Sequence, residues 1–182
     1  MPSSQDTIAA IATPAGQAGI GIIRISGPIS YAIAQKLFLP RKSLKGFESH
    51  RLYLGELRDP ESGDTFDEVL LSFMKGPRSY TCEDVIEINS HSGHVLLSKI
   101  LQLVLNEGAR LAEPGEFTWR AYLNGRIDLT QAEAVVDLIN ARSERGIHLA
   151  SLQLRGHLAK DVEKLREVLM DLLARTEVAI DF

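Results

Sequence analysis

The chain has 182 residues, 45% of them hydrophobic, and a formal net charge of -4 at pH 7. This length can bury one core, or one core plus a helical extension, and the net negative charge argues against a domain that grips nucleic acid by itself. A single cysteine excludes an internal disulfide, no apolar run approaches the ~20 residues that cross a bilayer, and the N-terminal residues lack a signal-peptide pattern. We therefore expect a protein of the reducing cytoplasm, without a membrane span.

The first elements in chain order are two isoleucine-rich runs, residues 7–13 and 20–26, which predict strands separated by a glycine-rich turn. Ser30 is then expected to cap a short helix, because serine at that position accepts a backbone N–H. The apolar stripe of this helix is formed by Ile33, Ala34, Leu37 and Phe38.

The next elements are two further strands, residues 51–57 and 66–74, flanking the turn DPESGD, which predicts an antiparallel hairpin. Residues 85–89 alternate as another strand. Residues 95–106 carry leucines four apart, which predict a helix that stops at Gly108. Together these signals predict an α+β fold with a mixed or antiparallel sheet.

After Pro114 the signals are helical to the end of the chain. Pro114 is expected to open a short helix that stops at Asn124 and Gly125. Thr130 and Glu133 fit a capping box for the next helix. The face expected to be apolar in that helix is formed by Ala132, Val135, Val136 and Ile139.

The segment from residue 143 onward has no proline and carries apolar residues at alternating spacings of four and three, typical of a seam that packs on other helices. The seam consists of Leu158, Val162, Leu165, Leu169, Leu172, Thr176 and Ala179. No glycine or proline ends it, so we expect the chain to be a fragment of a longer protein. The alternative is a short protein whose long helix pairs with a second copy.

Nucleotide-binding motifs are missing from the sequence. No G-x-x-x-x-G-K-[ST] occurs, so the chain is predicted to neither bind nor hydrolyse GTP by itself. The glycine cluster between residues 13 and 20 lies between two expected strands, whereas a dinucleotide fingerprint requires a strand followed by a helix. We interpret it as a turn.

Two charged residues interrupt apolar strands. Arg24 shares a strand face with Ile22 and Ser26, so it either forms a structural salt bridge at a sheet edge or binds an anion or acceptor. Glu87 projects from the face opposite Ile86 and Ile88, and the pattern alone makes it a solvent-facing residue.

His91, His94 and Cys82 form only a loose set of metal-binding residue types, without the spacing of a zinc site. Turn and helix-start positions are the preferred interpretation of the two histidines, and a buried or incidental thiol that of Cys82.

Five segments of the sequence resemble the N-terminal part of the MnmE (TrmE) tRNA-modifying GTPases. They are DTIAAIATP, AGIGIIRISGP, GPRSYTCEDVIEINSHSG, EPGEFTWRAYLNGRIDLTQAEAVVDLI and EVAIDF. The resemblance implies a tetrahydrofolate-binding, homodimerising domain akin to one-carbon transferases at residues 1–124. It also implies that residues 125–182 are the first helices of a helical domain, and that the family's GTPase domain and C-terminal cysteine motif are absent.

The same resemblance implies a function for the whole family member. It would work with the flavoprotein MnmG (GidA) on the wobble uridine of certain tRNAs, installing a 5-aminomethyl-type (carboxymethylaminomethyl) group. The carbon would come from 5-formyl- or 5,10-methylenetetrahydrofolate. GTP, magnesium and potassium would bind only through the absent GTPase domain, so the resemblance implies no catalytic residue and no metal ligand in this chain.

Three folate contacts are implied by motif. Arg24 matches the arginine of a GILRISG-like strand, Glu87 the second glutamate of a GEDVLEL-like segment, and Arg126 the lysine of an NGKLDL-like turn. A carboxylate such as Glu87 can accept two adjacent pterin N–H donors, and arginine can donate to a formyl or carboxylate oxygen. Lysine to arginine at position 126 keeps the charge and changes the shape.

Two residues depart from the family pattern: Cys82 replaces a common glycine in TGED, and Ser92 replaces a glycine in HGG. These departures motivate one alternative, a structural homodimerisation module that does not bind folate. Another alternative, an independent aminomethyltransferase, requires a general base, and no motif places one.

Overall fold

The computed structural model describes residues 6–14, 16 and 18–181. The expected turn between the first two strands contains residues 15 and 17, which lie outside the described residues. The contacts between Cα atoms divide the chain into two compact units, Met1–Asn124 and Gly125–Phe182.

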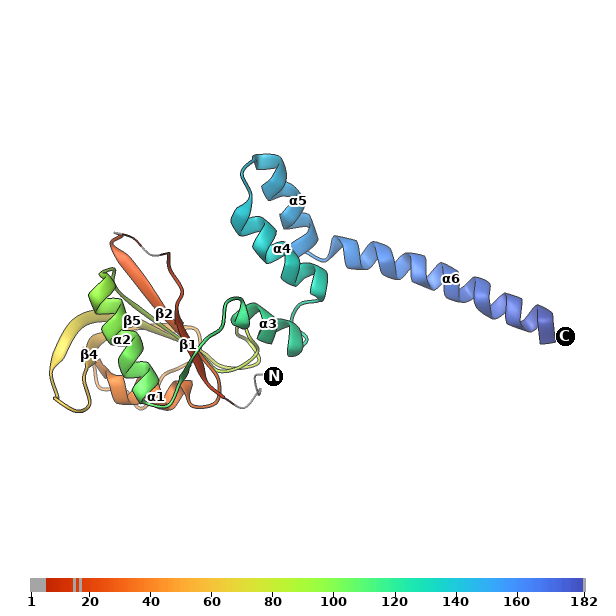
Figure 1. Cartoon of the computed structure of the whole chain (residues 1–182). Helices are drawn as coiled ribbons and strands as arrows, with labels where there is room; N and C mark the ends of the chain where they lie inside the picture. The colour runs from red at the N-terminus through yellow and green to blue at the C-terminus, as the bar shows by residue number, and fades with distance from the viewer. Residues whose placement is uncertain (1–5, 15, 17, 182) are drawn as a thin grey trace. The chain divides into compact units, whose positions relative to one another are not determined.

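The first unit is built on a seven-stranded sheet with the strand order β3-β4-β5-β6-β2-β1-β7 (Figure 1). Its strands are β1 (Ile8–Ile11), β2 (Ile20–Ser26), β3 (Phe38–Pro40), β4 (Arg51–Arg58), β5 (Thr65–Met74), β6 (Val85–His91) and β7 (Arg110–Leu111). All neighbouring strands are antiparallel except β1 and β7, which are parallel. The predicted α+β fold with a mixed sheet is confirmed.

Helices α1 (Ser30–Leu37) and α2 (His94–Asn106) pack on one face of this sheet and form the core with it (Figure 1). The alternation of the strands places Ile23 and Ile25 of β2 and Ile86 and Ile88 of β6 on this helix-covered face, where all four are fully buried. Burial of these aliphatic side chains supplies most of the driving force that holds the sheet to its helices.

The opposite face of the sheet is covered only at one end. There α3 (Glu116–Leu123) and the loop 75–84, which joins β5 to β6, lie over Ser26 and Val85. Towards the other end the face carries four exposed apolar side chains, which we call the open apolar face: Ile20, Leu52, Leu54 and Leu70. Arg24 and Glu87 lie on this same side of the sheet, between the covered end and the open apolar face.

Most of the predicted strands and helices of the first unit are confirmed. The turn DPESGD joins β4 to β5 as an antiparallel hairpin, with Gly63 at a φ of 79° that favours glycine. Helix α2 ends at Asn106 with Glu107 as its C-cap, and Gly108 follows with a φ of 102°, as a helix stop requires.

Two sequence predictions for α1 are wrong. Ser30 does not cap the helix, because its hydroxyl donates to the Asp84 carbonyl 3.0 Å away and Ile29 occupies the cap position. Phe38 leaves the helix and begins β3. Strands β3 and β7 were not predicted, because three and two residues are too short to show an alternating pattern.

The second unit is helical, and its helices are α4 (Leu129–Asn140), α5 (Glu144–Leu154) and α6 (His157–Asp181). The predicted capping box at Thr130 and Glu133 is wrong. Asp128 is the cap instead: its carboxylate accepts the Gln131 N–H at 2.8 Å, and the Gln131 side chain accepts the Asp128 N–H at 2.9 Å. Aspartate caps a helix as well as threonine does, so the pattern alone allowed both starts.

The apolar face predicted for α4 is buried only in part, because Ala132 and Val135 are half-buried. Ala134 is the buried residue of the helix, whereas Val136 and Ile139 are exposed.

Helix α6 follows a break at Gly156, whose φ of 74° ends α5. The seam leucines of α6 are exposed, as the seam pattern predicted for a helix without its bundle partners. Among the described residues, no helix combines the length and apolarity required to span a membrane.

The contrast between the core and the α6 seam gives the first prediction. Leu71 is 0% exposed and Leu169 is 57% exposed. Leu71→Ala should lower the free energy of unfolding by about 2–5 kcal/mol, because it leaves a cavity, whereas Leu169→Ala should change it by less than about 0.5 kcal/mol. Urea unfolding followed by circular dichroism measures both. A large loss of unfolding free energy in Leu169→Ala would contradict the finding that the seam is exposed.

Candidate functional site

The register of two central strands brings Arg24 and Glu87 together. Arg24 of β2 lies directly opposite Glu87 of β6 in the antiparallel ladder. Arg24 Nε donates to Glu87 Oε1 at 2.8 Å, and Arg24 Nη2 lies 2.7 Å from the same oxygen. The side chains are 29% and 21% exposed, so the pair is sheltered but accessible from solvent.

This arrangement corrects two interpretations of the sequence. Arg24 forms a salt bridge, but β2 lies between β6 and β1 and is not an edge strand. Glu87 is half-buried beside the arginine and is not an open solvent-facing residue. Both errors arise because an alternating pattern gives a residue's face but neither the strand order nor what covers that face.

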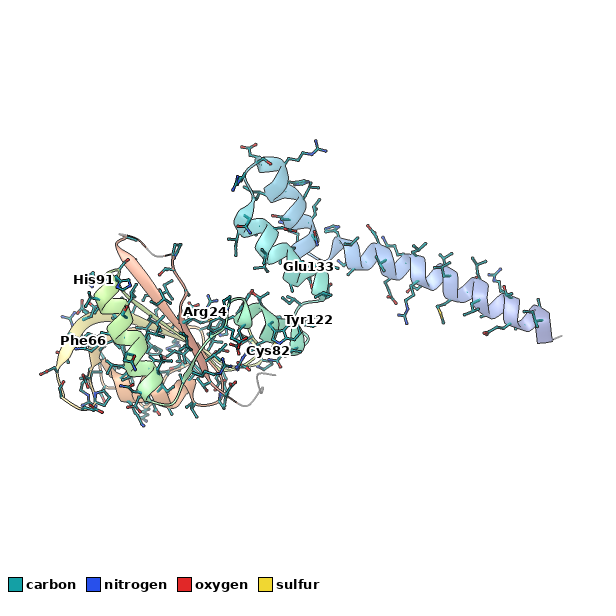
Figure 2. The ribbon with its side chains drawn as sticks, viewed as in Figure 1. Arg24, Phe66, Cys82, His91, Tyr122 and Glu133 are labelled. Atoms are coloured by element: carbon teal, nitrogen blue, oxygen red, sulfur yellow. The ribbon has the colours of Figure 1, made fainter. Side chains whose placement is uncertain are left out.

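Two aromatic rings lie against the guanidinium of Arg24. Its Cζ is 5.5 Å from the centre of the Tyr80 ring and 5.6 Å from the centre of the Phe117 ring. Tyr80 belongs to the loop 75–84 and Phe117 to α3, so two segments distant in sequence meet at the arginine (Figure 2 labels Arg24). Both distances are within the range of cation–π attraction.

The loop 75–84 and α3 are joined by three side chains of the helix or its cap. Thr118 Oγ1 lies 2.8 Å from Tyr80 Oη, Asn124 Nδ2 donates to the Thr81 carbonyl at 2.6 Å, and Arg120 Nη1 donates to both carboxylate oxygens of Glu83 at 3.1 and 3.2 Å. These bonds fix the positions of the two rings relative to the sheet.

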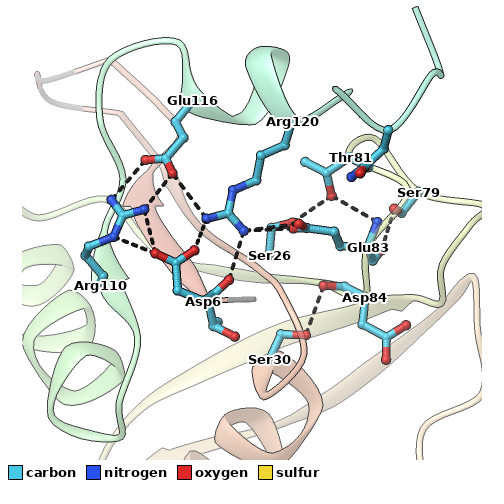
Figure 3. A network of polar contacts seen from close by, with 12 residues as sticks. Asp6, Ser26, Ser30, Ser79, Thr81, Glu83, Asp84, Arg110, Glu116 and Arg120 are labelled. Atoms are coloured by element: carbon cyan, nitrogen blue, oxygen red, sulfur yellow. Dashed lines mark hydrogen bonds and ion pairs between the residues drawn. The ribbon is translucent and has the colours of Figure 1, made fainter. Parts of the chain in front are cut away.

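Arg120 is the centre of a larger ionic network (Figure 3). Its side chain is 4% exposed, and besides Glu83 it contacts Asp6 Oδ1 and the Glu116 carboxylate, the latter at 3.1 Å. Arg110 of β7 binds the same two acids, at 2.9 Å to Asp6 and 2.6 Å to Glu116. Two arginines and three carboxylates therefore satisfy one another where isolated charges would be costly to bury.

The hydroxyl of Ser26 extends this network to the sheet. Ser26 Oγ is buried and donates to Glu83 Oε2 at 2.6 Å, and Thr81 Oγ1 lies 2.6 Å from the same hydroxyl. Because the single proton of Ser26 goes to the carboxylate, Thr81 is the donor in the second bond.

The network lowers the pKa of two of its acids, Glu116 and Asp6. Burial raises the pKa of Glu116, but hydrogen bonds from Arg110, the Glu113 N–H and Arg120 outweigh it and lower the value from 4.5 to about 2. Burial likewise raises the pKa of Asp6, and hydrogen bonds from Arg110 and Arg120 lower it below its ordinary value. Both carboxyls are thus held as anions at neutral pH.

The two departures from the family pattern differ in their structural consequence. Cys82 has a φ of 62°, in the left-handed region that glycine adopts freely, so the loop 75–84 makes a turn there that favours glycine. Its thiol is free and half-buried. Ser92 is not in the left-handed region, and the serine is compatible with its backbone conformation.

Arg126 is exposed and belongs to the second unit, in the short turn between α3 and α4. The first unit thus brings together two of the three predicted site residues, Arg24 and Glu87. The participation of Arg126 in the same site stays a prediction.

His91 has a local partner in Asp67. His91 Nδ1 lies 2.7 Å from Asp67 Oδ1, and the backbone N–H of His91 donates to Asp67 Oδ2 at 3.1 Å. His94 is the first residue of α2. Within the part of the chain that the structure describes, no group of three or more histidine, cysteine, aspartate or glutamate residues could hold a metal ion.

The sequence analysis missed the roles of Tyr80, Phe117 and Arg120. All three lie inside the quoted segments GPRSYTCED and PGEFTWRA, so the signal was present in the motifs. It could not be assigned to the site, because only the fold shows that these segments meet at Arg24.

Fold and site together define an α+β domain with a half-buried arginine–glutamate pair beside two aromatic rings, followed by a helical unit. Comparison with known families agrees with this class. Residues 7–126 match the family model described as "GTP-binding protein TrmE N-terminus", and residues 129–182 match the "MnmE helical domain".

Curated relatives extend the match over the whole chain. The tRNA modification GTPase MnmE of Syntrophobacter fumaroxidans is 57% identical over 182 residues, covering 100% of this chain and 39% of the relative. Those of Alkaliphilus oremlandii and Acetivibrio thermocellus are 55% and 52% identical, covering 97% and 98% of this chain and 39% of each relative. The chain belongs to the MnmE (TrmE) family, and it spans about two fifths of the length of these relatives.

The lowered pKa of Glu116 gives the second prediction. Its folded value, about 2, lies below the ordinary 4.5, so the ion pairs contribute fully to stability above pH 4.5. That contribution, about 3 kcal/mol, should disappear as the pH falls through 2. Glu116→Gln should therefore be less stable than the unaltered chain at pH 7, with the difference shrinking towards pH 2.

Urea unfolding at a series of pH values measures this difference. Glu113→Gln is the matched control, because Glu113 is exposed in the same segment. A pH dependence that is the same for Glu116→Gln and the unaltered chain would contradict the assignment.

Proposed function

We propose that this chain is the tetrahydrofolate-binding and dimerising part of a tRNA modification GTPase. Residues 1–124 bind the one-carbon donor and pair with a second copy, and residues 125–182 begin the helical domain. The observation that carries the proposal is the Arg24–Glu87 pair, which is accessible from solvent and lies at the positions of the family's folate contacts.

The chemistry of the pair suits a pterin ring. A pterin presents an N–H and an amino group side by side, and a carboxylate such as that of Glu87 accepts both. Arg126 supplies a further cation for a formyl or carboxylate oxygen of the ligand. The structural dimerisation module without folate binding has less support, since a module of that kind has no need of an accessible ion pair on the sheet.

The proposed role of the whole protein follows from the family. With the flavoprotein MnmG it installs a 5-aminomethyl-type (carboxymethylaminomethyl) group on the wobble uridine of certain tRNAs in the cytoplasm. The donor is 5-formyl- or 5,10-methylenetetrahydrofolate. The chain contains no P-loop, so GTP, magnesium and potassium bind to a GTPase domain outside these residues.

The open apolar face supports the homodimer. Leu52, Leu54 and Leu70 neighbour one another on β4 and β5, and Ile20 lies two strands away on β2, beyond β6. Exposed apolar patches mark interfaces between proteins. A second copy laid against this face would also shelter the neighbouring Arg24–Glu87 pair from water, which would strengthen its hydrogen bonds to a ligand.

The third prediction concerns folate. In titration calorimetry with 5-formyltetrahydrofolate, Glu87→Ala should weaken binding about 10- to 100-fold, because a charge-assisted hydrogen bond is worth ~1.5–3 kcal/mol. Arg126→Ala should cost a similar factor, and Arg126→Lys much less, since lysine keeps the charge. Glu56→Ala, an exposed glutamate on the same side of the sheet, is the control and should bind normally.

Two outcomes would contradict the proposal. The unaltered chain could fail to bind the ligand, which would favour the structural module. Glu87→Ala and Glu56→Ala could also bind equally well, which would move the site away from the ion pair.

The fourth prediction concerns the dimer. The chain should sediment as a dimer, and Leu52→Glu should convert it to a monomer by burying a charge in the interface. Val95→Glu, at an exposed position of α2 on the other side of the sheet, should leave the dimer intact. Sedimentation velocity distinguishes these states. A dimer that withstands Leu52→Glu would exclude the open apolar face as the interface.

A further inference from the structure

Charged side chains are distributed unevenly along the hairpin of β4 and β5. The turn end of the hairpin, residues 56–68, carries one cation, Arg58, and six acids: Glu56, Asp59, Glu61, Asp64, Asp67 and Glu68. The opposite end and the segments beside it carry four exposed cations, which we call the cationic end: Lys45, Arg51, Lys75 and Arg78. The net charge of -4 for the whole chain therefore hides a local excess of positive charge at one end of the sheet.

The segments that carry these cations are bonded to one another. Ser49 Oγ accepts the backbone N–H of Lys75 at 2.9 Å, which joins the loop 41–50 to the end of β5. Tyr31 Oη accepts the backbone N–H of Phe47 at 3.0 Å, which joins the same loop to the start of α1. The fold therefore gathers the cations at one end of the sheet.

The acids close to the cationic end already have protein partners. They are Glu48, Glu83 and Asp84, which bind Arg51, Arg120 and the Gly76 N–H, respectively. The side chains of Lys75 and Arg78, in contrast, form no ion pair and no hydrogen bond within the part of the chain that the structure describes. Their charges are therefore open to an external anion.

We infer that the cationic end is a contact surface for the phosphate backbone of an RNA substrate. The inference rests on the proposed function, in which the substrate is a tRNA. RNA presents a dense array of phosphate charges, which exposed lysine and arginine side chains bind with release of counterions. The acidic turn at the other end of the hairpin repels the same backbone, so the two ends together determine from which end of the sheet an RNA approaches.

The cationic end is also next to the candidate site. Arg78 and Tyr80 belong to the same loop, and the centre of the Tyr80 ring lies 5.5 Å from Cζ of Arg24. A phosphate bound by Arg78 therefore lies close to the Arg24–Glu87 pair. Phosphate contacts position a nucleic acid without reading its sequence, so this surface orients the substrate while other groups select it.

Fluorescence anisotropy of a labelled, unmodified tRNA titrated with the full 182-residue chain tests the inference. With so few cations, the chain should bind weakly, with a Kd of about 1–100 μM at physiological salt. The double variant Lys75→Ala, Arg78→Ala should bind about tenfold more weakly. Its plot of log K against log salt concentration should be shallower by about 1.4–1.8, because each phosphate contact contributes about 0.7–0.9 to the slope.

The double variant Lys36→Ala, Lys99→Ala is the matched control, because it removes the same charge from helices α1 and α2 of the first unit. It should bind tRNA as the unaltered chain does. Equal losses in the two double variants, or no binding by the unaltered chain at low salt, would overturn the inference. The charge-preserving variant Lys75→Arg, Arg78→Lys should bind within about twofold of the unaltered chain, which separates loss of charge from loss of the fold.

Competition distinguishes RNA from an acidic protein as the partner. Polyglutamate should displace the labelled tRNA far less well than unlabelled tRNA does at equal charge, and equal displacement would overturn the assignment to RNA. Folate binding is measured separately. A chain that binds tRNA but not 5-formyltetrahydrofolate therefore refutes the folate proposal and leaves this inference standing.

Discussion

Arg120 carries a positive charge at a position that is 4% exposed, and the site depends on how that charge is compensated. Its carboxylate partners come from three separate segments: Asp6 precedes β1, Glu83 lies in the loop 75–84, and Glu116 begins α3. A buried guanidinium without partners would be strongly destabilising. These segments are therefore held together, and with them the two rings that meet at Arg24.

Arginine suits position 120 because the side chain there has several hydrogen-bond acceptors around it. A guanidinium has five donors in a fixed plane, and Arg120 uses its two terminal nitrogens to reach Glu83, Glu116, and both the carboxylate and the carbonyl of Asp6. A lysine has three donors on one nitrogen and could not span acids on different sides. The network is thus a structural device, while the neighbouring Arg24–Glu87 pair stays accessible and suited to a ligand.

The sequence predicted the secondary-structure elements more reliably than the tertiary contacts between them. The long strands and α2 have clear periodicity, and the hairpin at DPESGD has clear turn chemistry. The cap of α4 could not be predicted uniquely, because both Asp128 and Thr130 suit a helix start. Arg24 and Glu87 interrupt apolar strands, but the family resemblance assigned them to a site, whereas Tyr80 and Phe117 looked like ordinary aromatic residues. Their contact with Arg24 depends on the packing of α3 on a loop some forty residues away, which no local pattern contains.

The central claim is that a half-buried arginine–glutamate pair, fixed by α3 and the loop 75–84, is a folate site in which Glu87 contacts the ligand. A crystal structure of the chain with 5-formyltetrahydrofolate tests it most directly. The account predicts that the pterin N–H and amino groups lie within hydrogen-bond distance of the Glu87 carboxylate. A ligand bound elsewhere would contradict it.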